Sequence, residues 1–211
     1  MSAQHIVLTP ENHDVAKTAA VASLRAGDVV CMAMDGAYIY AAYAFNQDAV
    51  YSILRMRGSN PGTQLQVLVG EINTALGIAT DFSGDLKKLG ENFWPGPLTL
   101  LLSAQRGLAW DLGDSNELPK FALRIPYSKF LRDVLSSTGP VAIASASVAG
   151  MQPLTDINFV QGDSVALYID EGILEGSLPS TVVQANESGL CEVVREGAIA
   201  RSDLLAFATF S

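Results

Sequence analysis

Residues 83–102 read SGDLKKLGENFWPGPLTLLL, and their order of helix, turn and strand decides the class of fold. The pattern predicts a helix over about 83–93. The turn Trp94-Pro95-Gly96-Pro97 ends this helix, because proline lacks the backbone N–H that a helix needs. The apolar run LTLLLS that follows predicts a buried strand. A helix joined to a strand by a short turn is typical of layered α/β domains.

Helices and strands alternate in the same way along the rest of the chain. Helices are expected over about 14–26, with Asp14 as N-cap and Gly27 at the end, over 47–57, over 128–138 and from about Ser202. Buried strands are expected at VVCMAM, LQVLV, FALRI, VAIAS and VALYID, and TVVQ and CEVVRE predict an antiparallel pair. No linker or repeat divides the chain. We therefore expect one domain over residues 1–211, an α/β fold with a twisted mixed β-sheet flanked by helices.

Composition and charge narrow the class of partner. Of the 211 residues, 49% are hydrophobic and 17% are charged, which indicates a compact globule. The formal net charge is −9, and the 13 lysines and arginines form no basic cluster. A protein that mainly neutralises phosphates usually carries a basic stripe. Nucleic acid is therefore not expected as the principal ligand, although a local positive cleft stays open.

The N-terminal sequence, the short apolar stretches and the two cysteines favour a cytoplasmic location. The start, MSAQHIVLTPENHD, lacks the basic cluster and apolar run of a signal peptide. The apolar stretches are shorter than the roughly 20 residues that span a bilayer. Cys31 and Cys191 match no metal or disulfide spacing. We expect a protein of a reducing compartment, with no membrane partner.

Several familiar catalytic signals are missing from the sequence. It contains neither a phosphate loop that ends in Gly-Lys-Ser/Thr nor a Gly-x-Gly-x-x-Gly motif between strand and helix. Only His5 and His13 could serve histidine-based chemistry, and both lie near the N-terminus. Ser145 and Ser147 lack the flanking glycines of a nucleophile elbow. Triad hydrolysis and a histidine-rich metal site are therefore not expected.

Three arginines at the ends of predicted elements suggest an anion site instead. Arg57 falls on the last turn of a helix, Arg124 lies within FALRIP and Arg195 within CEVVREG. A guanidinium donates two parallel hydrogen bonds to a carboxylate or a phosphate. Each arginine could equally pair with a structural carboxylate, and a cation on a last helical turn is favoured by the helix dipole in any case. The residues alone leave both interpretations open.

The order of five short motifs resembles the YrdC-like family, the threonylcarbamoyl-adenylate synthases, from about residue 14 to residue 205. The motifs are Trp94-Pro95-Gly96-Pro97-Leu98-Thr99, Leu123-Arg124-Ile125-Pro126, the loop PVAIASASVAG over 140–150, Pro179-Ser180-Thr181-Val182-Val183 and Arg195-Glu196-Gly197-Ala198-Ile199. The resemblance implies a sheet with a cleft. It also implies a reaction in which ATP, L-threonine and bicarbonate give threonylcarbamoyl-AMP and pyrophosphate, for the modification of adenosine 37 in tRNAs.

The resemblance further implies which residues form the site. Arg57 and Asp35 would be catalytic. Substrate and nucleotide would be bound by Ser59, Arg124, Ser145, Ser147, Ser180, Thr181 and Arg195, with Mg²⁺ entering together with ATP. Each short hydroxyl could instead cap local backbone, and Asp35 could cap a turn beside Gly36. Other partners implied by the resemblance are tRNA, double-stranded RNA and tRNA-modification proteins.

The sequence departs from the family pattern near the expected triphosphate end. The family's Pro-Thr-Asp-Thr appears as Ala33-Met34-Asp35-Gly36, and its Lys-x-Arg aligns with Arg57-Gly58-Ser59. The lysine usually found before Leu65 has no counterpart near Thr63. One lost charge-assisted contact weakens binding by about 1.5–3 kcal/mol.

The serine loop departs as well, and two other functions therefore stay open. In that loop Ala144, Ser147 and Ala149 replace threonine, asparagine and serine. The first alternative is a non-catalytic paralogue that binds a nucleotide or RNA. The second is a carbamoyl-adenylate enzyme with another acceptor, as in hydrogenase-maturation carbamoyltransferases.

Overall fold

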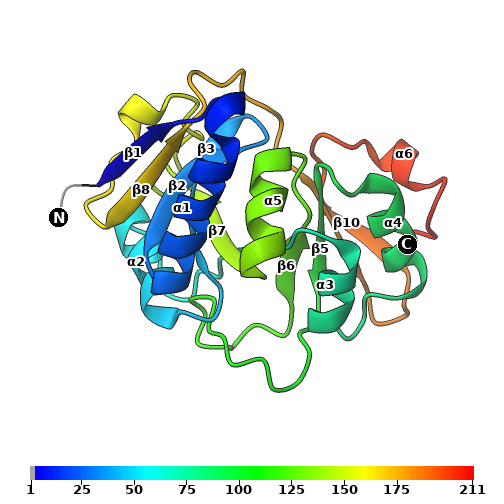
Figure 1. The fold of residues 1–211 in the computed structure, drawn as a ribbon. Coiled ribbons are helices and arrows are strands. Elements are labelled where there is room, and N and C mark those ends of the chain that lie inside the picture. Colours follow the sequence, from blue (N-terminus) through cyan, green and yellow to red (C-terminus); the bar gives the residue numbers. More distant parts are fainter. Residues whose placement is uncertain (1–2) are drawn as a thin grey trace.

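The computed structural model describes residues 3–211 and consists of one continuous mixed β-sheet with helices packed on it (Figure 1). The strands are β1 (Gln4–Val7), β2 (Val29–Met34), β3 (Ala37–Tyr43), β4 (Gln66–Leu68), β5 (Leu98–Leu102), β6 (Phe121–Arg124), β7 (Val141–Ser145), β8 (Val165–Asp170), β9 (Thr181–Ala185) and β10 (Cys191–Arg195). Their order in the sheet is β1-β8-β2-β3-β7-β4-β6-β5-β9-β10. The β1/β8, β2/β8, β4/β6 and β5/β9 pairs are parallel and the others antiparallel. The predicted α/β class with a mixed sheet is confirmed.

The helices agree with the sequence patterns at most positions. They are α1 (His13–Ala26), α2 (Gln47–Arg57), α3 (Ile72–Ile78), α4 (Gly84–Phe93), α5 (Lys129–Thr138) and α6 (Arg201–Leu204), with short 3-10 turns at Pro10–Asn12 and Ile157–Phe159. Gly27 and Gly58 end α1 and α2 in the left-handed conformation, which glycine adopts without steric cost. The predicted cap at Asp14 is wrong, because α1 begins at His13 with Asn12 as its N-cap.

Three elements were not expected from the sequence. They are β1, β3 and α3, of which β3 pairs with both β2 and β7 in the middle of the sheet. The segment AYIYAAY of β3 is buried at five consecutive positions and shows no alternation of polar and apolar residues. A strand that is covered on both faces has no polar face to alternate, and periodicity therefore misses it.

Two hydrophobic clusters cover opposite faces of the sheet. Along β2, Val29, Cys31 and Ala33 belong to the larger cluster, whereas Val30 and Met32 belong to the smaller one, as the two-residue repeat of a strand requires. The smaller cluster packs under α1 and α5, which lie side by side in Figure 1. The larger one includes residues of α2, α3 and α4.

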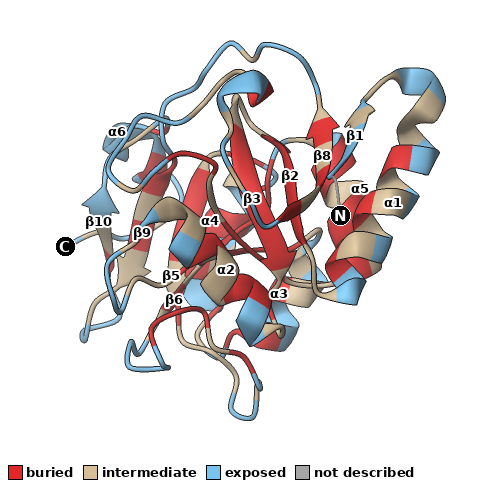
Figure 2. Cartoon of the chain, turned by 90° about the vertical axis from the view of Figure 1, so that its left-hand side faces the viewer, coloured by how far each residue is buried: buried red, intermediate tan, exposed pale blue. Residues whose placement is uncertain are grey.

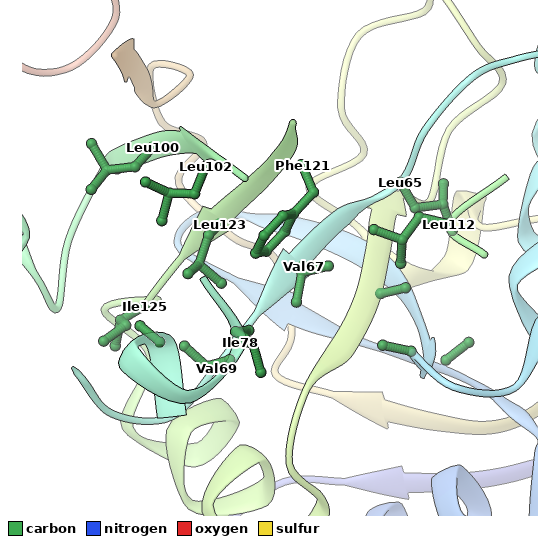
Figure 3. Close-up of a cluster of buried hydrophobic side chains, with 14 of the residues drawn as sticks. Leu65, Val67, Val69, Ile78, Leu100, Leu102, Leu112, Phe121, Leu123 and Ile125 are labelled. Atoms are coloured by element: carbon green, nitrogen blue, oxygen red, sulfur yellow. The ribbon is translucent and has the colours of Figure 1, made fainter. Parts of the chain in front are cut away.

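The larger cluster continues across β4, β6 and β5 to the edge of the sheet formed by β9 and β10. Figure 3 shows Val67, Leu123 and Leu100 on neighbouring strands of this part. Figure 2 shows the buried central strands flanked by helices whose outer surfaces are exposed. Among residues 3–211, no helix combines the length and the apolar character that a membrane crossing needs.

Candidate active site

A cavity of about 750 Å³ opens on the α1/α5 face of the sheet. Ile39 and Ile143 belong to the small cluster under these helices and also line the cavity. The cavity thus occupies the part of this face that the two helices leave uncovered. Its walls come from β3 and the ends of β2, β4, β6, β7 and β10, from the α2 C-terminus and from the loops over 63–65, 152–155 and 176–180.

Six of the predicted site residues line this one cavity. They are Asp35, Arg57, Arg124, Ser145, Ser180 and Arg195. Among the described residues that line it, three are arginines and one, Asp35, is acidic. A surplus of positive charge is therefore concentrated in one hollow of a chain whose formal net charge is −9. Such a site attracts anions.

Arg124 and Asp35 form a buried ion pair at one end of the cavity. Their side chains are only 7% and 14% exposed. Arg124 Nε also donates to the Gly96 carbonyl at 2.8 Å, and the Asp35 carboxylate accepts from the backbone N–H groups of Tyr127 (3.0 Å) and Ser128 (2.9 Å). Asp35 itself adopts a left-handed conformation, with φ of 48°. The carboxylate thus joins the β2–β3 turn, the arginine strand and the start of α5.

Burial affects the electrostatics of this pair. It lowers the pKa of Arg124, Asp35 opposes that shift, and the nearby Arg195 charge adds to it. The guanidinium still stays charged, because arginine does not deprotonate in proteins. Arg124 and Arg195 therefore form two neighbouring cations, of which the first is already partly neutralised by Asp35.

Arg57 holds the serine loop against the end of α2. Its Nη1 donates to the carbonyl of Ser145 and, at 3.0 Å, to that of Ser147. The backbone carbonyl of Arg57 accepts from Ala149 N at 2.8 Å. Burial lowers the pKa of Arg57 as well. Arg57 lines the cavity, but its Nη1 already donates to the serine loop and is not free for a ligand.

Three predicted residues do not line the cavity. Ser147 is 6% exposed, and its hydroxyl lies 2.8 Å from that of Ser145. Thr181 is fully buried, and its hydroxyl donates to Ile199 O and accepts from two backbone N–H groups. Ser59 has a buried hydroxyl for which the described residues provide no partner. The structure thus places Ser147 and Thr181 behind the cavity wall.

Several polar residues of the cavity had no signal in the sequence. Thr63, Gln64 and Gln66 also line it, and Gln66 Nε2 donates to Thr99 Oγ1 at 2.9 Å. Ser177 donates to the backbone carbonyl of Asp35. An isolated glutamine, threonine or serine carries no pattern of its own, so only the fold identifies these residues.

The cavity residues do not form a protein cage for Mg²⁺. The one carboxylate among its described lining residues is Asp35, whose two oxygens already accept the bonds given above. Within residues 3–211, no group of three histidine, cysteine, aspartate or glutamate side chains is placed to hold a metal. Mg²⁺ often binds through substrate phosphates and water instead.

The chain belongs to the Sua5/YciO/YrdC family, whose model, described as "Telomere recombination", matches residues 22–197. Within this family it is similar to threonylcarbamoyl-AMP synthases. It is 33% identical over 177 residues to a putative threonylcarbamoyl-AMP synthase of Mycobacterium tuberculosis, a match that covers 82% of this chain and 81% of the relative.

Two solved structures share the fold. One is P. abyssi Sua5 complexed with L-threonine, with a TM-score of 0.84 and 21% identity. That match covers all of this chain but only 63% of the Sua5 chain. The other is E. coli YciO, with a TM-score of 0.77, 20% identity and coverage of 93% of this chain and 95% of that one. These structures support the fold, and the family model together with the Mycobacterium relative confirms the predicted family.

Proposed function

We propose that the protein is a threonylcarbamoyl-AMP synthase with a weakened triphosphate site. The observation that carries the proposal is the cavity itself, where Arg57, Arg124 and Arg195 surround one hollow in a chain of this family. The name of the Mycobacterium relative and the L-threonine bound to the Sua5 relative support the same choice of substrates.

In the proposed reaction, the amine of L-threonine and bicarbonate first form a carbamate and release water. A carbamate oxygen then attacks the α-phosphorus of ATP. A new P–O bond forms, the bond between the α-phosphorus and the bridging oxygen breaks, and pyrophosphate leaves. Both reactants are anions, so the main task of the protein is to hold them together against their repulsion.

The cavity residues can perform this task to different degrees. Arg195 and Arg124 would hold one anionic group at the Asp35 end, and Arg57 would face the other. Ser145 and Ser180 would orient the substrates by hydrogen bonds. Mg²⁺ supplied with ATP would neutralise part of the triphosphate charge. The lining formed by Thr63 and Gln64 is polar but uncharged, which predicts weak binding of the triphosphate.

Pyrophosphate release from ATP tests the proposal. We expect slow release that requires both L-threonine and bicarbonate, and its rate should fall at least tenfold in Arg195→Ala. Arg106→Ala, which removes an exposed arginine outside the cavity, is the matched control and should keep the wild-type rate. No release at saturating substrates from the folded wild-type protein would refute the synthase proposal.

A cation added at Thr63 should strengthen nucleotide binding. Thr63 lines the cavity, and its hydroxyl donates only to the nearby Asn60 carbonyl, at 2.7 Å. We expect Thr63→Lys to tighten the dissociation constant of ATP by about tenfold, because one charge-assisted contact contributes about 1.5 kcal/mol or more. Titration calorimetry at two salt concentrations measures the change.

Thr63→Gln is the matched control, since it loses the same local hydrogen bond and adds length without charge. Its ATP affinity should stay near that of the wild type. The gain in Thr63→Lys should also shrink at high salt, because salt screens the added charge. Equal affinities in both variants would show that the triphosphate does not reach the part of the cavity lined by Thr63.

The expected weak binding of the triphosphate is also compatible with a second candidate function. A paralogue that binds nucleotide without turnover would show AMP binding but no pyrophosphate release. Contact with tRNA, double-stranded RNA or tRNA-modification proteins stays a prediction, as does another carbamoyl acceptor. A cytoplasmic location, where ATP is available, is part of the same proposal.

A further inference from the structure

Gln66, Thr99, Ser180 and Arg195 form a continuous series of hydrogen bonds, and all of them except Thr99 line the cavity. Gln66 Nε2 donates to Thr99 Oγ1 at 2.9 Å, and Thr99 Oγ1 lies 2.8 Å from Ser180 Oγ. Arg195 Nη2 donates to Ser180 Oγ at 3.1 Å and to the Ser180 carbonyl at 2.8 Å. The series connects β4, β5, the loop before β9 and the end of β10.

Gln66 and Arg195, at the two ends of this series of hydrogen bonds, determine whether the hydroxyls of Thr99 and Ser180 donate or accept. An arginine can only donate, and the amide nitrogen of Gln66 can only donate. Thr99 Oγ1 therefore accepts from Gln66, and Ser180 Oγ accepts from Arg195. The hydrogen bond between the two hydroxyls uses the proton of one of them. The proton of the other hydroxyl then has no acceptor among these four side chains.

Burial decides which proton is left over. Thr99 is 3% exposed and does not line the cavity, and the described residues give its hydroxyl no further acceptor. If Ser180 donated to Thr99, the proton of Thr99 would be buried without a partner, and the full desolvation penalty of that group would disfavour this arrangement. If Thr99 donates to Ser180, the proton of Ser180 is the free one, and Ser180 lines the cavity.

From this count we propose that Gln66 and Thr99 are positioning residues, which act through Ser180 by turning its hydroxyl proton toward an oxyanion bound in the cavity. The Ser180 hydroxyl then donates to the same anionic group that Arg195 and Arg124 attract. This group is a phosphate or a carboxylate of the substrates. The inference rests on the proposed function for the identity of these substrates, but the series of hydrogen bonds itself does not.

The test is a double-mutant cycle on the folded full-length chain. Calorimetry measures the affinity for inorganic phosphate, AMP and L-threonine separately. Thr99→Val, which keeps the shape and removes the hydroxyl, should weaken oxyanion binding by about tenfold, as should Ser180→Ala. Thr99→Ser keeps the hydroxyl and should bind within about twofold of the wild type. Gln66→Met should weaken binding in the same direction as Thr99→Val.

The decisive measurement is Thr99→Val in the Ser180→Ala background. If Thr99 acts through Ser180, the second substitution should weaken binding no further. An additional tenfold loss there would mean a general structural effect and would overturn the proposal, as would unchanged affinities in Thr99→Val. A loss confined to AMP assigns the oxyanion as phosphate, and a loss confined to L-threonine assigns it as carboxylate; either supports the proposal.

The outcomes also separate this inference from the proposed function. A wild-type protein that binds inorganic phosphate, but neither AMP nor L-threonine, would refute the synthase proposal, and the cycle would then be measured with phosphate. A wild-type protein that binds none of the three would overturn both.

Discussion

Replacement of Asp35 by asparagine is expected to lower the free energy of unfolding by about 3–5 kcal/mol and, in the molecules that stay folded, to tighten phosphate binding. Asparagine keeps the size of the side chain but leaves the 7% exposed guanidinium of Arg124 without a countercharge. The neighbouring Arg195 charge adds to the repulsion. The same loss of negative charge raises the positive potential of the cavity, and we expect about a tenfold gain in phosphate affinity.

Urea denaturation and calorimetry with inorganic phosphate measure the two effects of Asp35→Asn. The control is Asp163→Asn, which removes an exposed carboxylate outside this cavity and should change stability by less than about 0.5 kcal/mol. In the double variant Asp35→Asn/Arg124→Met, much of the lost stability should return, because no charge is left buried. A single variant as stable as the control would contradict the role assigned to this ion pair.

Asp35→Asn is expected to lower stability but to raise phosphate affinity, and these opposite effects distinguish two roles of Asp35. Asp35 stabilises the cavity wall through Arg124 and the two N–H groups at the start of α5. At the same time it reduces the positive charge available to a ligand. The departures around Asp35 in the sequence therefore remove possible substrate contacts while they leave the structural bonds of the carboxylate in place.

The sequence predicted which residues surround the cavity better than it predicted their bonds. Asp35, Arg57, Arg124, Ser145, Ser180 and Arg195 come from segments far apart in the chain, and the resemblance to the family was sufficient to group them. Their partners were not predictable. Arg124 binds a carboxylate 89 residues away, and Arg57 binds carbonyls 88 and 90 residues away. Local periodicity contains no information on such pairs.

Elements of the fold were missed for related reasons. The β3 segment AYIYAAY lacks alternation because both of its faces are covered. The edge strand β1 is short and mostly exposed, and it is fixed by its pairing with β8 rather than by its own pattern. Gln66 and Thr99 became visible as site residues only when the sheet placed their side chains, on β4 and β5 with β6 between them, within hydrogen-bonding distance.

Thr181→Val is the second substitution with a large expected effect, a loss of about 3 kcal/mol of unfolding free energy. Thr181 was predicted to bind substrate, yet its side chain is fully buried. Its hydroxyl donates to Ile199 O at 2.6 Å and accepts from Gly197 N and Ile199 N, both at 3.0 Å. Valine has the same shape but would leave these backbone groups buried without a partner.

Thr181→Ser separates the hydroxyl from the methyl group of the side chain. Serine keeps the three hydrogen bonds and loses one buried methyl, so its cost should be about 1 kcal/mol. Because Thr181 does not reach the cavity, AMP affinity of the folded Thr181→Val protein should stay within about threefold of the wild type. A large loss of AMP affinity with unchanged stability would instead make Thr181 a ligand contact, because the hydroxyl would then be worth more to the bound anion than to the backbone of residues 197–199.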